Sequence, residues 1–380
     1  MLQANGHNII YILLVTFFTS LVFVPISKRI AAHIGALDYP NERKIHKVVM
    51  PRLGGLAVYA SFLLGFMLFG DNSPQMLSVL IGSFVLMIMG IIDDVKGVPA
   101  RYQFLSHIVA ACIVVFYGKI YLTDISLFSL YFSFPRIVAY IVSILFIVSL
   151  ISAINLVDGL DGMSSGICII YFITISIVAY LLGNFGGLEI ILALIMIGSL
   201  LGFLVYNFPP ASTFVGQCGS NFMGFMVAVT SLIGFKTTTL TSLIIPIIIL
   251  ALPIFDTAFS IFRRLLKGQG ITEPDKEHFH HQLLKMRFSP RLSVLIVYMI
   301  NILFAAVSIF YILGDDLSAM VIYILLMILL LFIVLKTDIL FEHHKNKKEI
   351  EEPIIDNKKV EVKQVSKPKK KTVNKTKRKK

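Results

Sequence analysis

The apolar run IVAYIVSILFIVSLISAI, residues 137–154, leads directly into the polar stretch NLVDGLDG, residues 155–162. The run is close to the length of about 20 apolar residues that a bilayer-spanning helix requires. If the helix continues beyond it, the three-residue spacing places Asn155, Asp158 and Asp161 along one side. The two segments therefore predict either a polar helix face at a membrane boundary or a polar loop between two membrane spans.

The composition of the whole chain is that of a polytopic membrane protein. Of its 380 residues, 57% are hydrophobic and only 15% are charged, whereas soluble domains have about 45–50% apolar and about 25% charged residues. The net charge of +12 lies mainly in short loops and at the C-terminal end. Membrane topology and membrane lipids with anionic headgroups explain this placement, so we expect no nucleic-acid partner. Cys112, Cys168 and Cys218 are too irregularly spaced to indicate disulfides or a metal knuckle.

Eleven segments are apolar and long enough to be membrane spans. They are residues 8–26, 53–70, 76–92, 103–121, 135–154, 163–182, 187–206, 219–235, 239–262, 293–313 and 317–336. We therefore predict an all-α polytopic integral membrane protein, with residues 1–336 as its transmembrane domain. Residues 337–380 are highly charged and have no hydrophobic core, which predicts a disordered basic cytoplasmic tail. This tail either keeps the chain soluble or adsorbs to anionic lipid.

The basic residues also predict the orientation of the chain in the membrane. The loops after the first and ninth predicted spans are strongly basic, whereas the loops of the opposite side carry few charges. The positive-inside rule then places the N-terminus outside the cell and the C-terminus in the cytoplasm. The unusual polar clusters all share the cytoplasmic side, namely residues 93–94, 155–162, 207–220 and 278–281. This arrangement predicts an active site on the cytoplasmic face.

Asp93 and Asp94 end the third apolar segment. Adjacent residues of a helix point about 100° apart, so one carboxylate can face a metal or a substrate while the other acts as a base or pairs with Lys96. A charge at the bilayer centre costs at least about 2.5–3.5 kcal/mol, so the pair belongs at the membrane boundary or in a wet cleft. The alternative is an ordinary charged helix end.

The sequence His278-Phe279-His280-His281 lies in a basic loop. Zinc is a poor fit there, because no cysteine is near and Asp275 and Glu277 are hard oxygen donors that suit magnesium better. Imidazoles beside Arg264 would bind diphosphate oxygens well. The alternative is a solvated charged loop.

Residues 207–220 combine a carboxamide, a proline turn and an aromatic residue with glycines that precede an apolar segment. Glycines at a helix start suit the close approach of an anionic ligand, and Asn207 adds polar groups. Phe214 is either a stacking platform for a base or an interfacial aromatic residue.

Residues 41–55 carry cationic side chains that are either topogenic or a docking site for an anionic substrate. These side chains include Lys44, His46 and Arg52. Further along the chain, Asp256 lies within the ninth apolar segment. A buried acid there indicates function, unless it pairs with a neighbouring arginine and is only structural.

In this order and with this topology, the motifs resemble those of the polyprenyl-phosphate N-acetylhexosamine-1-phosphate transferases. The segments that carry the resemblance are residues 43–46, 51–55, 90–94, 155–162, 206–208, 216–224, 253–257 and 278–281. The His-x-His-His pattern resembles the branch that uses UDP-N-acetylglucosamine (UDP-GlcNAc) to initiate wall teichoic acid, O-antigen or similar glycopolymers.

The resemblance implies transfer of GlcNAc-1-phosphate from UDP-GlcNAc to undecaprenyl phosphate, which yields undecaprenyl-diphosphate-GlcNAc and UMP. It implies a multi-pass protein of a bacterial plasma membrane. It also implies magnesium (Mg2+) as the cofactor, with manganese (Mn2+) as a substitute, and it favours a homodimer.

The resemblance further assigns roles to individual residues. The expected catalytic residues are Asp93, Asp94, Asp158 and His281, with Asp93 or Asp94 deprotonating or orienting the lipid phosphate. The metal is expected beside Asp94 and Gln217. The expected substrate contacts are Lys44, His46, Arg52, Asn155, Asp161, Asn207, Phe214, Arg264, His278 and His280. Among these, Phe214 is expected to stack on uracil, and the histidines with Arg264 to bind the sugar and the diphosphate.

One position departs from the family pattern. The segment Gly216-Gln217-Cys218-Gly219-Ser220 reads Gly-Asp-x-Gly-Ser in the family, where the Asp is a magnesium ligand. An amide oxygen can ligate magnesium but brings no charge, so metal affinity and turnover should fall. Gln217 therefore indicates either an engineered substitution or a naturally impaired chain, and it keeps an inactive nucleotide-sugar-binding scaffold as an alternative. A transporter is the third hypothesis, which only Asp256 favours.

Overall fold

The computed structural model describes residues 3–4, 6–40, 48–127, 130–183, 186–236, 244–266, 278–314 and 316–336. These residues are mainly helical, and their short strands pair into antiparallel two-stranded sheets. The chain divides into two units, Met1–Phe341 and Glu342–Lys380, and every described residue belongs to the first. The predicted tail, residues 337–380, lies outside the described residues.

The helices follow the apolar segments of the sequence. Their bounds are α1 Ile9–Ile34, α2 Gly54–Phe69, α3 Pro74–Lys96, α4 Ala100–Cys112, the π-helical turn η1 Ile113–Tyr117, α5 Arg136–Val157, α6 Met163–Leu181, α7 Leu188–Asn207, α8 Gly216–Lys236, α9 Ile244–Ile249, α10 Ala251–Leu266, α11 Phe279–Lys285, α12 Pro290–Leu313 and α13 Asp316–Lys336. The strand pairs are β1 Gln3–Ala4 with β2 His7–Asn8, β3 Leu37–Asp38 with β4 Met50–Pro51, and β5 Asp124–Leu127 with β6 Leu130–Ser133.

Seven helices of the described part of the chain are long and apolar enough to cross a membrane. They are α1, α3, α4 continued by η1, α5, α6, α7 and α12. The helix α2 and parts of α10 and α13 are apolar but shorter. The all-α polytopic class is therefore supported, whereas the number of spans and their orientation stay predictions.

Only residues 158–162 of the polar stretch form a loop, because residues 155–157 are the last residues of a helix. The helix α5 ends at Val157, Asp158 is its C-cap, and the following turn closes at Gly162 with a left-handed φ of 75°. Gly162 favours such a turn because glycine lacks the side chain that would disfavour positive φ. The interpretation as a continuous helix is wrong beyond Val157, and the polar-loop alternative is confirmed.

The ninth predicted span, residues 239–262, is not one helix. A turn at Leu250 separates α9 from α10. The cause is Pro253, which has no N–H to donate to the carbonyl group of Ile249. The first helix also differs from its prediction: it continues to Ile34, where the left-handed Gly35 ends it.

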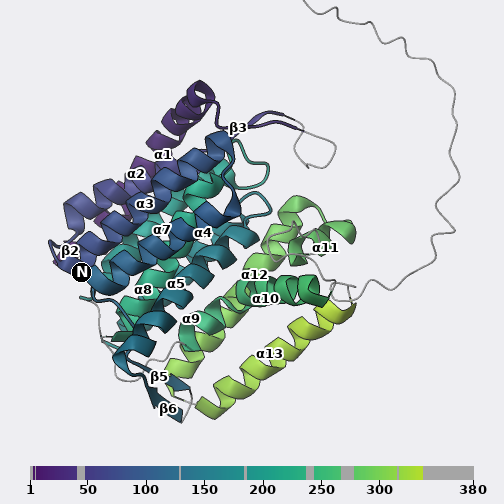
Figure 1. Ribbon diagram of the computed structural model, residues 1–380. Coiled ribbons are helices and arrows are strands. Elements are labelled where there is room, and N and C mark those ends of the chain that lie inside the picture. Colours follow the sequence, from purple (N-terminus) through teal and green to yellow (C-terminus); the bar gives the residue numbers. More distant parts are fainter. Residues whose placement is uncertain are drawn as a thin grey trace, which may run out of the picture. The chain divides into compact units, whose positions relative to one another are not determined.

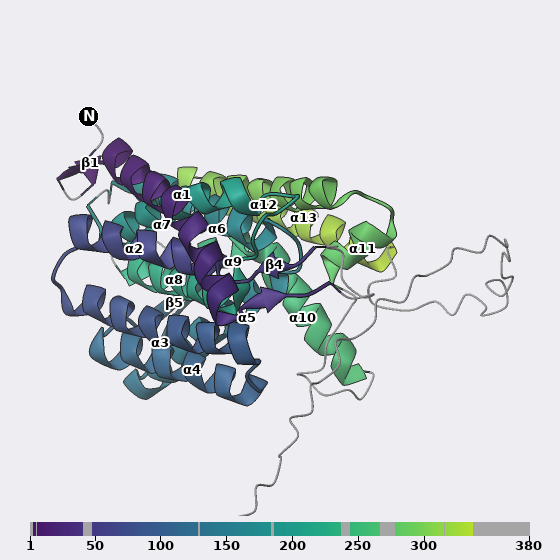
Figure 2. The same ribbon diagram turned by 90° about the horizontal axis from the view of Figure 1, so that it is seen from above.

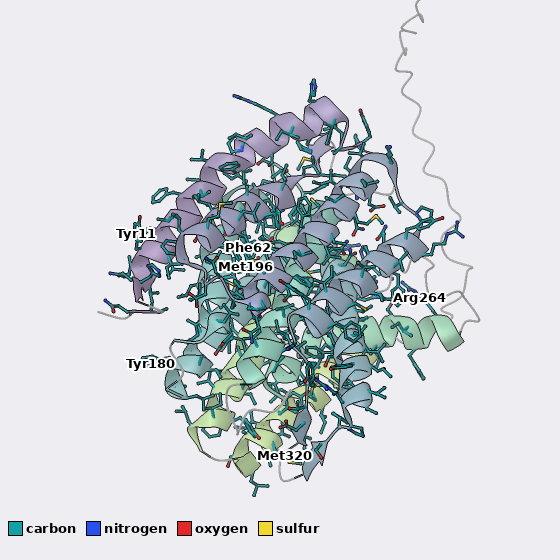
Figure 3. All side chains as sticks on the ribbon, turned by 60° about the vertical axis from the view of Figure 1, so that its left-hand side comes forward. Tyr11, Phe62, Tyr180, Met196, Arg264 and Met320 are labelled. Carbon is teal, nitrogen blue, oxygen red and sulfur yellow. The ribbon has the colours of Figure 1, made fainter. Side chains whose placement is uncertain are left out.

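The helix α7 lies at the centre of the helix packing. It contacts α1, α2, α6 and α8, and most of its side chains are buried. Figure 3 shows Met196 of α7 and Phe62 of α2 in the interior, whereas Tyr11 and Tyr180 lie at the edge. The exposed apolar side chains at this edge are those expected to face lipid.

The polar connections lie together at one end of the helices. Figure 1 shows β3 and α11 at one end and β2, β5 and β6 at the other. Figure 2 shows α3 and α4 side by side along one flank, and α3 and α5 both contact α8. The end of α3, the end of α5 and the start of α8 therefore meet, and the candidate site lies where they do.

Candidate active site

The carboxylate of Asp94, in the last turn of α3, lies at the N-terminus of α8. Its Oδ1 and Oδ2 accept hydrogen bonds from the backbone N–H groups of Gln217 and Cys218, at 2.9 and 3.1 Å. The carboxylate is fully buried, and the Nε of Arg52 lies 3.7 Å from Oδ1. Because a helix N-terminus carries partial positive charge, α8 and Arg52 together stabilise this buried anion.

Glycines permit this close approach. A Cβ atom at Gly216 would lie 1.8 Å from the carbonyl oxygen of Arg52 and 2.6 Å from Asp94 Oδ2, and Gly216 has a φ of +73°. A Cβ atom at Gly90, one turn before Asp94, would lie 2.3 Å from the Cα atom of Cys218. Both positions therefore require glycine for α3 to reach the start of α8.

Asp93 has a different environment from its neighbour Asp94. Its Oδ1 accepts a 2.5 Å hydrogen bond from the backbone N–H of Val98, just beyond the end of α3. The side chain is partly exposed, whereas Asp94 is buried. The two carboxylates thus have separate partners, as the angle between adjacent helical residues requires. Their expected catalytic roles stay predictions.

Carboxamide side chains meet beside Asp94. The Nδ2 of Asn155, in the last turn of α5, donates to Gln217 Oε1 and, at 2.7 Å, to Asn221 Oδ1. Asn155 and Gln217 were expected here, but Asn221 was not, because it reads as part of an apolar segment and only the fold brings it to α5. The oxygen of Gln217 that was expected beside a metal is therefore bonded to a protein donor.

Asp158 directly follows α5, and its Oδ1 accepts a 2.5 Å hydrogen bond from the Oγ of Ser164. Burial raises the pKa of Asp158 to about 7, and the nearby carboxylates of Asp94 and Asp161 act in the same direction. The Ser164 hydrogen bond and the charge of Arg52 oppose this shift in pKa. A carboxyl group with this pKa exchanges its proton near neutral pH, as general acid–base catalysis requires.

Asn207 and Asp161 hold two loops together. The Oδ1 of Asn207 accepts a hydrogen bond from the N–H of Gly162 at 3.1 Å, and its Nδ2 donates to the carbonyl group of Thr213 at 3.0 Å. The Oδ2 of Asp161 accepts a hydrogen bond from the N–H of Ala211 at 2.9 Å. These bonds give both residues a framework role, and their substrate contacts stay predictions.

Two residues of α12 that the sequence did not indicate complete this framework. The Nε of Arg291 donates to the carbonyl group of Pro209 at 2.7 Å, and the hydroxyl of Tyr298 donates to the carbonyl group of Gly162 at 2.6 Å. In the sequence, Arg291 reads as a topogenic charge and Tyr298 as part of an apolar span. Their partners lie far away along the chain, so no local pattern could identify them.

Phe214 lies on a segment that pairs with the end of β4 and with the residues that follow it. Its N–H donates to the carbonyl group of Pro51 at 2.8 Å, and its carbonyl group accepts a hydrogen bond from the N–H of Gly54 at 2.9 Å. The side chain of Phe214 is half-buried. This pairing brings Phe214 close to Arg52 and to the start of α8, and its expected stacking on a base stays a prediction.

The histidine segment packs on α10. The Nδ1 of His278 lies 3.0 Å from Asp256 Oδ2, and the N–H of Phe279 donates to Asp256 Oδ1 at 2.8 Å. The ring centroids of His278 and His281 are 6.4 Å apart. Asp256 thus pairs with a histidine of this segment, which the sequence alone did not indicate.

The structure describes only some of the other expected site residues. Arg264 is buried in the last turns of α10 (Figure 3). Lys44 and His46 lie outside the described residues, as does the side chain of His280. Their expected roles stay predictions.

The two expected metal ligands, Asp94 and Gln217, are both engaged by protein donors. Within the described ranges, no group of three His, Cys, Asp or Glu side chains could hold a metal ion. Both oxygens of Asp94 accept backbone N–H groups, and the amide oxygen of Gln217 accepts from Asn155. Magnesium requires near-octahedral oxygen ligands, usually with carboxylate charge. Binding of magnesium or manganese by Asp94 and Gln217 therefore stays a prediction.

Known proteins resemble this chain over most of its length. The sequence profile described as glycosyl transferase family 4 matches residues 76–235, a range that contains Asp94, Asn155, Asp158 and Gln217. The "Probable undecaprenyl-phosphate N-acetylglucosaminyl 1-phosphate transferase" of Bacillus subtilis is 38% identical over 311 residues, which cover 80% of this chain and 85% of that protein.

Two further relatives have related names. The "Decaprenyl-phosphate N-acetylglucosaminephosphotransferase" of Mycobacterium leprae is 31% identical over 320 residues, covering 75% of this chain and 78% of that protein. The "Undecaprenyl-phosphate alpha-N-acetylglucosaminyl 1-phosphate transferase" of Escherichia coli K12 is 26% identical over 305 residues, covering 77% and 80%. The similarity thus extends well beyond the profile match.

Proposed function

The chain belongs to glycosyl transferase family 4, and on this premise we propose that it transfers GlcNAc-1-phosphate from UDP-GlcNAc to undecaprenyl phosphate. In this reaction the lipid phosphate forms a new bond to the sugar-bearing phosphorus, and the bond from that phosphorus to UMP breaks. The products are undecaprenyl-diphosphate-GlcNAc and UMP. A polyprenyl acceptor requires an enzyme in the bilayer, and the chain is a multi-pass protein of a bacterial plasma membrane.

The main observation in support of the proposal is the arrangement of charged groups at the start of α8. Phosphoryl transfer depends mainly on positioning and on neutralising phosphate charge. The side chain of Arg52 is 34% exposed and is held 3.7 Å from the buried carboxylate of Asp94, so it can bind a phosphate while remaining anchored. Asp94 in turn fixes the N-terminus of α8.

Asp158 supplies the acid–base group in this proposal. Its pKa of about 7 lies close to the second pKa of a phosphate monoester, about 6. The ionised carboxylate can therefore take the proton of the lipid phosphate near neutral pH, which makes the acceptor oxygen more nucleophilic. Phe214 would stack on the uracil ring, and His278 and His281 would bind the diphosphate and the sugar.

Several finer features belong to the proposal as predictions. These are dependence on magnesium, or on manganese in its place, a site that faces the cytoplasm, and a homodimer. The lipid-linked product would be the first membrane intermediate of a cell-envelope glycopolymer such as wall teichoic acid.

The experiment is transfer of radiolabelled GlcNAc-1-phosphate from UDP-GlcNAc to undecaprenyl phosphate by the purified chain, with and without magnesium. We expect the label in an organic-soluble lipid product, and UMP released in equal amount. If no product forms with or without magnesium while UDP-GlcNAc still binds, the proposal is contradicted.

That contradicting outcome would favour the second candidate, a nucleotide-sugar-binding scaffold. The observation that supports the scaffold is Gln217, whose amide oxygen is engaged by Asn155 at a position where the family has a carboxylate. Absence of both product and binding would instead favour the transporter hypothesis.

A further inference from the structure

Asp256 is a buried carboxylate on an apolar helix, outside the cluster at the start of α8. Its exposed fraction is 8%, and that of its partner His278 is 5%. A buried carboxylate destabilises the fold unless its oxygens are hydrogen-bonded or paired. Here Oδ1 accepts the N–H of Phe279 at 2.8 Å, and Oδ2 lies 3.0 Å from His278 Nδ1.

This carboxylate fixes the start of α11 in two ways. His278 is the N-cap residue of α11, but its own side chain makes no capping hydrogen bond. Asp256 supplies the missing acceptor from α10, because its Oδ1 binds the first N–H group of α11. The backbone N–H of His281 then donates to the carbonyl group of His278 at 2.9 Å. The positions of both histidines therefore depend on Asp256.

The pairing also selects one state of the imidazole ring of His278. A neutral imidazole has one donor and one acceptor nitrogen, and the hydrogen bond made by one nitrogen sets the state of the other. With Asp256 as the acceptor, Nδ1 carries the proton and Nε2 is the acceptor nitrogen.

We propose that Asp256 is a positioning residue of the transferase site, which orients His278 and the start of α11 for contact with the diphosphate and the sugar. This inference rests on the proposed function, because that function assigns His278 and His281 to the substrate. It predicts that Asp256 acts on catalysis through His278, and not merely by stabilising α10.

A double-mutant cycle tests this coupling. The variants are Asp256→Asn, His278→Gln and the double variant, with Thr257→Val as the matched control. Thr257 is the next residue of α10, and its hydroxyl has no hydrogen-bond partner among the residues that the structure describes. We expect Asp256→Asn to lower kcat/KM for UDP-GlcNAc by about 10- to 100-fold, by analogy with the carboxylate partners that orient metal-ligating histidines.

The decisive result is the effect of Asp256→Asn in the His278→Gln background. If Asp256 acts through His278, the loss there is much smaller than in the wild-type background, and Thr257→Val stays near the wild-type value. An undiminished loss in the His278→Gln background would overturn the proposal. If Asp256→Asn does not fold, Asp256→Glu, which keeps the charge but shifts it by one methylene group, replaces it in the cycle.

A spectroscopic measurement tests the same inference without any turnover. In the purified chain labelled with 15N-histidine, the His278 signals are identified by their loss in His278→Gln. We expect a ring protonated at Nδ1 in the wild type and a shift toward protonation at Nε2 in Asp256→Asn. An unchanged ring state would overturn the proposal. A shift in a chain that makes no lipid product would instead reject the proposed function while the positioning role stands.

Discussion

The backbone N–H of Gln217 donates to the carboxylate of Asp94 at 2.9 Å, so the last turn of α3 closes the N-terminus of α8. The same carboxylate accepts the N–H of Cys218 and lies near the guanidinium group of Arg52. One buried anion thus holds three elements that are far apart in the sequence. Changes at this contact should affect stability and activity together.

The first prediction is the effect of Asp94→Asn. An asparagine has one acceptor oxygen where aspartate has two, so one of the N–H groups of Gln217 and Cys218 is left without an acceptor. An unsatisfied buried donor costs about 1–3 kcal/mol, and Arg52 loses one of its two carboxylate partners, keeping Asp38 at 3.8 Å. We expect a lower melting temperature in detergent and a large loss of transfer activity.

Asp93→Asn is the matched control for this change, because Asp93 is partly exposed and an asparagine oxygen can still accept from Val98. We expect the control to melt within a few degrees of the wild type. If the two variants were equally destabilised, the hydrogen bonds from α8 to Asp94 would contribute no more to stability than the bond from Val98 to Asp93.

The second prediction concerns pH and Asp158. Because the pKa of Asp158 is raised to about 7, its ionised fraction grows as pH rises through neutrality. If the carboxylate takes the proton of the lipid phosphate, kcat should rise with pH and reach half its plateau near that pKa. Asp158→Asn should remove this limb of the pH–rate profile. An identical profile in the variant would assign the titration to the lipid phosphate or to another group.

The same shift in pKa also predicts that the stability of the chain depends on pH. The pKa of Asp158 rises from 3.8 to about 7 on folding. Between these values the folded chain keeps a proton that the unfolded chain has released, so the free energy of unfolding falls as pH rises through this window. Above the folded pKa the contribution no longer changes. Asp158→Asn should flatten the slope of melting temperature against pH, and a slope equal to that of the wild type would contradict the assignment.

The third prediction compares two glycines with positive φ. In Gly216→Ala the new Cβ atom would lie 1.8 Å from the carbonyl oxygen of Arg52, whereas a Cβ atom at Gly97 meets nothing within 4 Å. Both substitutions carry the backbone strain of positive φ, about 1–2 kcal/mol. Only Gly216→Ala adds a clash at the site.

Thermal unfolding and transfer assays of both alanine variants separate these two effects. We expect Gly97→Ala to lose some stability but to keep its activity, and Gly216→Ala to lose both. Similar losses of stability and activity in the two variants would show that backbone strain explains both effects. The close packing of Gly216 against Arg52 would then not be needed.

The sequence predicted most helices because each one corresponds to a long apolar run. It did not predict the break at Leu250, because the apolar pattern continues through it and only the missing N–H of Pro253 interrupts the hydrogen bonding. The loop that follows Val157 was one of two alternatives, and it closes at Gly162, whose positive φ suits glycine. Periodicity thus identifies spans, whereas single residues set where helices end.

The candidate site was predictable where polar residues interrupt apolar segments, as at Asp94 and Asp158. Its supporting contacts were not, because their partners are distant in sequence. Asn221 bonds to Asn155, and Tyr298 bonds to Gly162, only because α8 and α12 pack beside those residues. In a membrane domain these polar contacts stand among apolar side chains, so sequence pattern gives little sign of them.

The last prediction is that Gln217→Asp raises transfer activity. The Nδ2 of Asn155 that now bonds to the amide oxygen of Gln217 is a donor that a carboxylate at this position can also accept, although aspartate is one methylene group shorter. It adds a negative charge beside Asp94, which is the change that divalent-cation binding needs. We therefore expect product formation to increase, and to depend on magnesium concentration more steeply than in the wild type.

Gln217→Asn is the control, because it shortens the side chain in the same way but adds no charge. A magnesium-dependent rise in melting temperature should appear in Gln217→Asp and not in Gln217→Asn, which reports on the cation independently of turnover. If the aspartate variant gains no activity at any magnesium concentration, residue 217 does not limit this chain. If it gains magnesium binding without activity, the charge is restored but another residue limits transfer, and Asn221, which shares the Asn155 donor with Gln217, is the next to replace.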